Sequence, residues 1–88
     1  MTISINQARA VGATIGIDWD DSPFDAEQLR RGMEVELEHG SQDPVTDVTG
    51  DAPVMTAKIA WAHLREIPDY YDRLEIMERE AEEFWTPC

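Results

Sequence analysis

The sequence predicts an all-α fold, a compact four-helix domain with a central antiparallel helix pair and a long C-terminal helix. Two observations predict it. Apolar residues recur at intervals of three and four in four segments, and helix-capping or helix-stopping residues delimit those segments. The 88 residues suffice for one domain with one small core. We therefore expect one domain, residues 1–88, with helices at about 4–15, 25–39, 54–66 and 68–84, and a loop at 40–53.

The first helix is expected to begin at Ser4, because Ser4 and Gln7 form a capping-box pattern. Gly16 is a good C-terminal stop. Gly12 lies inside the segment, where glycine costs about 1 kcal/mol relative to alanine, so it indicates a close contact with another element. The connector that follows is expected to fold two aromatic residues back onto the core, Trp19 and Phe24.

The second helix carries a carboxylate on its apolar face. Asp25 resembles an N-cap and Gly40 a stop. The apolar stripe between them consists of Ala26, Leu29, Met33 and Leu37. At about 100° per residue, Glu36 lies near the centre of this stripe. A buried carboxylate there needs a partner, because an unpaired buried charge is costly.

The loop at 40–53 is rich in turn residues and long for so small a domain. Asp47, Thr49 and Asp51 match the start of a calcium loop, but Ala52 stands where glycine is required and Lys58 where the bidentate glutamate should be. Turns in which aspartate side chains accept backbone hydrogen bonds explain this composition better.

The third and fourth helices meet at Pro68, which ends one helix and suits the first turn of the next. His63 and Glu66 both project from the apolar face of the third helix, which is formed by Met55, Ile59, Ala62 and Ile67. The fourth helix has a long stripe that we expect to close the core, formed by Tyr70, Leu74, Met77, Ala81 and Trp85.

The chain is strongly acidic, with 7 Lys and Arg against 19 Asp and Glu and a formal net charge of −12. Such a charge opposes direct binding to nucleic acid and to anionic lipid surfaces. It fits a well-solvated surface, a mimic of nucleic acid that occupies basic grooves, or adaptation to high salt. Cys88 is the single cysteine, so neither an intrachain disulfide nor a cysteine-based metal site can form. No apolar run approaches the roughly 18–20 residues of a membrane span. We expect a cytoplasmic protein.

Two Glu/His pairs at a spacing of three residues raise the hypothesis of a metal site. Glu36 with His39, and His63 with Glu66, would each share a helix face, and an antiparallel helix pair would bring them together. Carboxylate and imidazole ligands at this spacing suit iron, manganese or zinc. The alternative is a core network in which His63 is hydrogen-bonded to Glu36 and no metal is bound. No other cofactor is expected.

Four strings in the chain resemble one family. They are Ile-Gly-Ile-Asp-Trp at 15–19, Gly-Met-Glu-Val-Glu-Leu-Glu-His-Gly at 32–40, Thr-Asp-Val-Thr at 46–49, and the run from Ile59 to Leu74 that contains His-Leu-Arg-Glu-Ile-Pro-Asp-Tyr-Tyr. The family comprises small uncharacterised proteins from bacteria, bacteriophages and gut metagenomes, catalogued as a domain of unknown function. The resemblance implies a compact helical protein, phage-borne, and transfers no activity. It places the protein in a bacterial or phage-infected cell, or in a virion.

The function that the sequence favours is binding to a protein partner without catalysis, as a host-factor antagonist or a virion component whose partner has a basic surface. Catalysis is poorly supported, since no serine lies in a glycine-flanked elbow and no glycine-rich phosphate loop occurs. The candidate partner-binding residues are Glu34, Glu38, Trp61, Glu75, Glu80, Glu82 and Glu83. A metal-binding protein is the second hypothesis. A structural homo-oligomer is the third, and it predicts an exposed apolar patch that includes Trp61 or Trp85.

Overall fold

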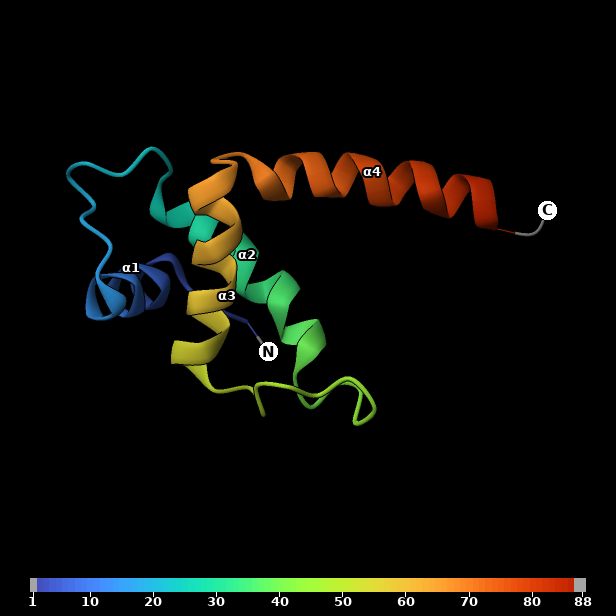
Figure 1. Ribbon diagram of the computed structural model, residues 1–88, viewed down its shortest axis with the longest axis horizontal. Coiled ribbons are helices and arrows are strands. Elements are labelled where there is room, and N and C mark those ends of the chain that lie inside the picture. The colour runs from blue at the N-terminus through green and yellow to red at the C-terminus, as the bar shows by residue number, and fades with distance from the viewer. Residues whose placement is uncertain (1, 87–88) are drawn as a thin grey trace.

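Four α-helices and one short 3-10 helix form the computed structural model, which describes residues 2–86 (Figure 1). The helices are α1 (Ile5–Ile15), α2 (Ala26–Glu36), α3 (Pro53–Glu66) and α4 (Tyr70–Trp85), and the 3-10 helix η1 (Leu37–His39) continues α2. No residue between 2 and 86 is in a strand, so the all-α prediction is confirmed. Cys88 lies outside the described residues.

The expected capping residues delimit α1 and α2. The backbone N–H of Gln7 donates to the Ser4 hydroxyl at 3.0 Å, and the backbone N–H of Ser4 donates to the Gln7 side chain at 2.8 Å, which completes the capping box. Gly16 ends α1 in the left-handed conformation with φ of 116°. Asp25 caps α2 by accepting from the backbone N–H of Gln28 at 2.9 Å.

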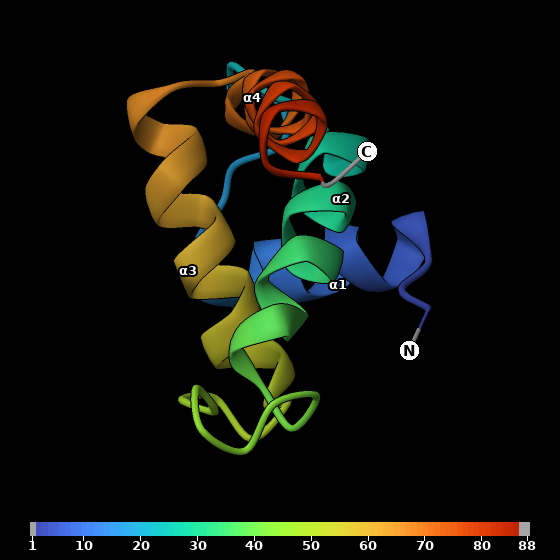
Figure 2. The same cartoon turned by 90° about the vertical axis from the view of Figure 1, so that its right-hand side faces the viewer.

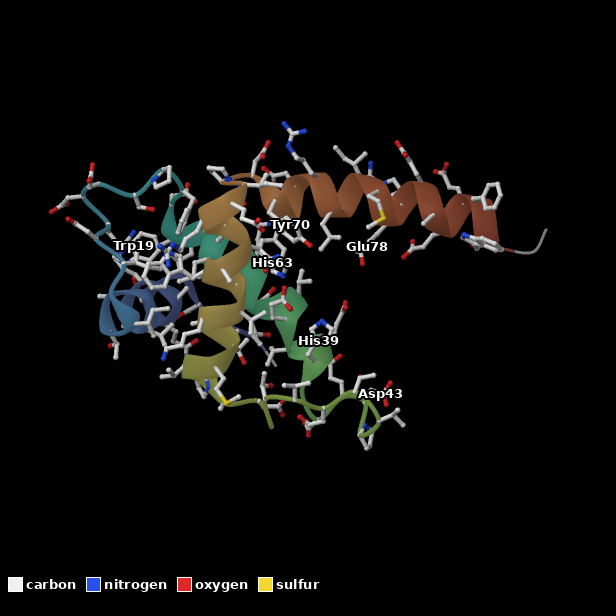
Figure 3. The ribbon with its side chains drawn as sticks, in the orientation of Figure 1. Trp19, His39, Asp43, His63, Tyr70 and Glu78 are labelled. Atoms are coloured by element: carbon white, nitrogen blue, oxygen red, sulfur yellow. The ribbon has the colours of Figure 1, made fainter. Side chains whose placement is uncertain are left out.

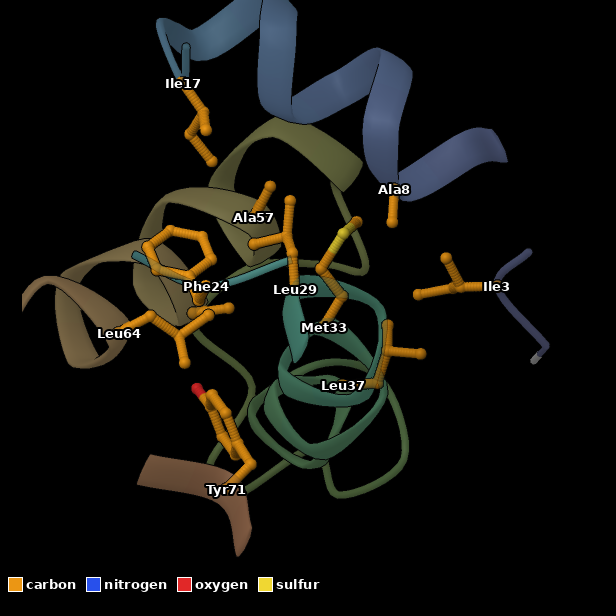
Figure 4. Close-up of a cluster of buried hydrophobic side chains, with 11 residues drawn as sticks. Ile3, Ala8, Ile17, Phe24, Leu29, Met33, Leu37, Ala57, Leu64 and Tyr71 are labelled. Atoms are coloured by element: carbon orange, nitrogen blue, oxygen red, sulfur yellow. The ribbon is translucent and has the colours of Figure 1, made fainter. Parts of the chain in front are cut away.

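Helices α2 and α3 run antiparallel and form the centre of the molecule, as predicted, and α1 packs across them (Figures 1 and 2). Their apolar faces enclose the core shown in Figure 4, whose members are Ile3, Ala8, Ile17, Phe24, Leu29, Met33, Leu37, Ala57, Ala60, Leu64 and Tyr71. Since all four helices or their flanking segments contribute side chains, the core holds every element of the chain in place through burial of apolar surface.

Gly12 is a point of close contact between α1 and its neighbours. A Cβ at Gly12 would lie 2.5 Å from a ring carbon of Trp19 and 3.0 Å from Leu29 of α2. Trp19 is fixed there by its indole N–H, which donates to the backbone carbonyl of Arg9 at 2.9 Å. Phe24 packs edge-on against Trp19 and is buried. The close contact at Gly12 and the inward fold of both aromatic residues are therefore confirmed.

The loop between η1 and α3 is ordered by its own aspartates. Asp43 accepts from the backbone N–H of Val45 at 3.0 Å, and Asp47 accepts from that of Gly50 at 2.7 Å. Asp51 accepts from both the backbone and the hydroxyl of Ser41, and these hydrogen bonds lower the pKa of its carboxyl group. Side-chain-to-backbone turns thus account for the loop, as the sequence predicted.

Only the start of α4 closes the core. Tyr71 is buried and Leu74 partly buried, but Met77 is 53% and Trp85 78% exposed. The prediction that the whole stripe would close the core is therefore wrong beyond the first turns. The physical reason is that α2 and α3 already cover each other and α1, while the 16 residues of α4 extend past them (Figures 1 and 2). No helix in the described part of the chain is long and apolar enough to cross a membrane.

Candidate functional site

A notch at Gly32 receives the side chain that anchors α4. A Cβ at Gly32 would lie 2.4 Å from the Tyr71 ring and 3.0 Å from the Cβ of Ala60, so only glycine leaves room for the ring between α2 and α3. Tyr71 is 1% exposed as a result. The missing Cβ thus decides where α4 is attached to the body of the protein.

The Tyr71 hydroxyl donates to Oε2 of Glu36 at 2.7 Å, and both groups are buried. Burial and this hydrogen bond to a carboxylate raise the pKa of the Tyr71 hydroxyl above its usual range, because both favour the protonated phenol. Glu36 therefore has a hydrogen-bond partner, as expected for a carboxylate in the apolar stripe. That partner is Tyr71, whereas the sequence analysis proposed His63.

Two imidazoles complete the surroundings of Glu36, those of His39 and His63, which are labelled in Figure 3. Nε2 of His39 lies 3.6 Å from Oε1, and Nε2 of His63 lies 3.6 Å from Oε2 of the same carboxylate. The His63 ring stacks on Tyr70 with 4.3 Å between centroids. We call Glu36, His39, His63 and Tyr71 the carboxylate cluster. It joins α2, η1, α3 and α4 at one point.

The carboxylate cluster contains three of the four residues predicted as metal ligands. Glu66, the fourth, is exposed at the C-terminal end of α3 and is absent from the contacts of Glu36. Within residues 2–86, no group of three or more His, Cys, Asp and Glu side chains is arranged to hold a metal ion. Binding of iron, manganese or zinc by Glu36, His39, His63 and Glu66 stays a prediction. The geometry fits a polar network that fixes α4.

The distal half of α4 extends past the other helices (Figure 1), and it presents large apolar side chains to solvent. Met77, Phe84 and Trp85 are 53%, 77% and 78% exposed. With Ala81 they lie on one side of the helix, in line with Leu74 at its anchored end. We call Met77, Ala81, Phe84 and Trp85 the free stripe. An apolar face of this kind on a projecting helix is typical of a protein-binding surface.

The seven residues predicted to bind a partner fall into two groups, three with contacts inside the protein and four with exposed side chains. Glu34 is engaged within the fold, since it pairs with Arg30 and accepts from the backbone N–H of Ile3. Trp61 is half-buried against the core beneath Arg65. Glu75 pairs with Arg31 and Arg79 across an exposed surface. The remaining four have exposed side chains, namely Glu38, Glu80, Glu82 and Glu83.

A second apolar feature is a groove of about 480 Å³ between α1 and the start of α3. Its walls include Ile3, Val11, Leu37 and Val54, and Asp51 lies at its edge. Sequence analysis did not predict this groove, because it forms only where three separate helices diverge.

The fold and the site define a small helical domain in which a buried carboxylate anchors a projecting C-terminal helix. The chain belongs to the family described as protein of unknown function (DUF5661), whose model matches residues 8–80. The resemblance to an uncharacterised domain family is therefore confirmed, and the match includes the whole carboxylate cluster. No curated protein and no solved structure matches the chain.

Proposed function

We propose that this protein binds a protein partner without catalysis and that the free stripe of α4 is its docking element. The observation that supports the proposal is the exposure of Phe84 and Trp85, each more than three-quarters exposed on a helix that leaves the body of the protein. Covering an exposed aromatic side chain contributes roughly 1.5–3 kcal/mol. A partner that covers the free stripe would therefore gain several such contributions at once.

The way in which α4 is anchored supports the same role. Tyr71 fills the Gly32 notch and donates to Glu36, so the first turn of α4 is rigidly attached. A fixed base presents the free stripe in one direction and lowers the conformational entropy that a partner must remove on binding. In this proposal the carboxylate cluster positions the docking helix and performs no chemistry.

Photo-crosslinking in the native host tests the proposal. p-Benzoylphenylalanine replaces Phe84 on the free stripe or, as the matched control, Arg79 on the opposite side of α4. We expect a covalent adduct with a different protein from position 84 and little or none from position 79. Equal adducts from both positions, or none from position 84, would contradict the proposal. An adduct between two copies of this chain would favour a homo-oligomer instead.

A further inference from the structure

The charges around the free stripe indicate the chemistry of the partner. On the helix, Glu78 and Glu82 border one edge of the stripe and Glu80 borders the other, while Glu83 lies further round, about 100° from Phe84. Their side chains are all exposed. Figure 3 shows Glu78 projecting from α4 on the side of the α2 C-terminus. The apolar surface is thus enclosed by acidic groups along both of its edges.

The basic residues of α4 do not neutralise these edges. Arg79 lies on the opposite side of the helix and pairs with Glu75 at 3.2 Å. Arg73 lies nearer the anchored end and pairs with Asp69 at 2.9 Å. No ion pair among the described residues involves Glu78, Glu80, Glu82 or Glu83.

The spacing of the apolar residues indicates the shape of the partner. Tyr70, Leu74, Met77, Ala81 and Phe84 follow one another at intervals of four and three, the seam spacing of paired helices. The unoccupied part of this seam, from Met77 to Trp85, spans about 12 Å at 1.5 Å per residue. A helix of about three turns would cover it, and side chains flanking its own apolar seam would meet the glutamates of α4.

On the basis of the proposed function, we infer that the segment bound by α4 is a basic amphipathic helix, with lysine or arginine on both sides of its apolar stripe. Apolar contact and charge complementarity then act on the same surface. A second copy of α4 fits less well, because pairing two free stripes would place glutamates opposite glutamates, and like charges facing each other oppose association.

Fluorescence anisotropy with three labelled synthetic peptides tests the inference against the full chain. The peptides share one leucine stripe on a helix of 18 residues, roughly five turns, and carry lysine, glutamine or glutamate at the flanking positions. A fourth peptide has the composition of the lysine peptide with its leucines distributed around the helix. It measures attraction to the acidic chain that needs no apolar stripe.

Two variants with equal net charge show whether a preference for the lysine peptide depends on the glutamates of α4. Glu78, Glu80, Glu82 and Glu83 are replaced by Gln in the first, which keeps helix propensity nearly unchanged. The control replaces four exposed carboxylates outside the free stripe and its borders, as D18N, D20N, D21N and E66Q. The two variants therefore have the same net charge.

We expect the lysine peptide to bind the unmodified chain at least about tenfold more tightly than the glutamine peptide, a difference of about 1.4 kcal/mol. The variant in α4 should abolish this difference and the control should retain it. Equal binding of lysine and glutamine peptides would overturn the inference and leave the docking role of α4 standing. The inference would also be overturned if the fourth peptide bound as tightly as the lysine peptide. The same holds if the control variant lost the preference for lysine as fully as the variant in α4. The proposed function is tested separately by crosslinking, and it fails if position 84 gives no adduct or no more adduct than position 79.

Discussion

Replacing Tyr71 by Phe removes one hydroxyl from the carboxylate cluster and leaves Glu36 buried without a donor. Glu36 is 4% exposed, and the nearest remaining groups are imidazole nitrogens at 3.6 Å, beyond hydrogen-bond range. A hydrogen bond to a charged group contributes about 1.5–3 kcal/mol. We therefore expect Y71F to lower the free energy of unfolding by about 2 kcal/mol, which for a domain of this size lowers Tm by about 8–16 °C.

Urea unfolding followed by far-ultraviolet circular dichroism measures this loss, with Tyr70→Phe as the matched control. The Tyr70 ring stacks on His63, a contact that phenylalanine preserves, so Y70F should change the free energy of unfolding by less than about 0.5 kcal/mol. In a Glu36→Gln background the acceptor is neutral, so Y71F should cost about half as much as in the unmodified chain, since neutral hydrogen bonds are about half as strong. A Y71F variant as stable as the unmodified protein, or a Y70F variant equally destabilised, would refute this account of the anchor.

Four further predictions concern the same elements. Gly32→Ala should be destabilising by up to about 2 kcal/mol in urea unfolding, because overpacking against Tyr71 costs about 1–3 kcal/mol and alanine gains only about 1 kcal/mol in a helix. A variant more stable than the unmodified chain would contradict the tight fit at Gly32. The pKa of the Tyr71 hydroxyl is raised in the folded state relative to the unfolded chain. Its contribution to the free energy of unfolding is therefore complete below pH about 10, the pKa of an unfolded tyrosine, and is lost as the pH rises further. Alkaline titrations should show a smaller loss of stability in Y71F than in the unmodified chain, and identical profiles would refute the assignment. Replacing exposed Phe84 and Trp85 by Ser should change the free energy of unfolding by less than about 0.5 kcal/mol each, and a larger loss would mean that the fold needs them. Elemental analysis of the purified protein should find iron, manganese and zinc well below one equivalent, whereas a near-stoichiometric metal that disappears in E36A/H63A would make the carboxylate cluster a metal site.

The parts of the fold that depend on local chemistry could be predicted from the sequence. The capping box at Ser4, the stop at Gly16 and the cap at Asp25 involve residues only a few positions apart, so their spacing is sufficient. The apolar stripe of α2 likewise predicted its buried face. The stripe expected on α3 was wrong, because Met55 and Ile67 are 45% and 40% exposed and the buried face of α3 lies one position away, with Ala57, Ala60 and Leu64. The position of Glu36 on such a stripe showed that it needed a partner, and the structure provides one.

The partner itself could not be predicted, because it depends on the direction in which the chain leaves Pro68. That turn sends Tyr71 into the Gly32 notch, 35 residues away from Glu36 in sequence. Glu66 was expected in the cluster because it shares a helix face with His63, but it lies where α3 ends and faces solvent. Periodicity gives the face of a residue and not the neighbour that covers it.

The stripe of α4 illustrates the same limit. Its spacing correctly indicates a helix with one apolar face, and nothing in the spacing distinguishes burial within the chain from burial against another protein. The structure makes the distinction, because Tyr71 lies inside the core while Phe84, on the same helix, is 77% exposed.

Hydrogen exchange of the chain alone and in complex with the partner recovered by crosslinking tests the docking role of α4 most directly. We predict that the backbone amides of residues 76–85 exchange at least about tenfold more slowly in the complex, since a bound helix suppresses local opening. The amides of the loop at 41–52 should be unaffected. Protection confined to the groove between α1 and α3, with α4 unchanged, would contradict the account.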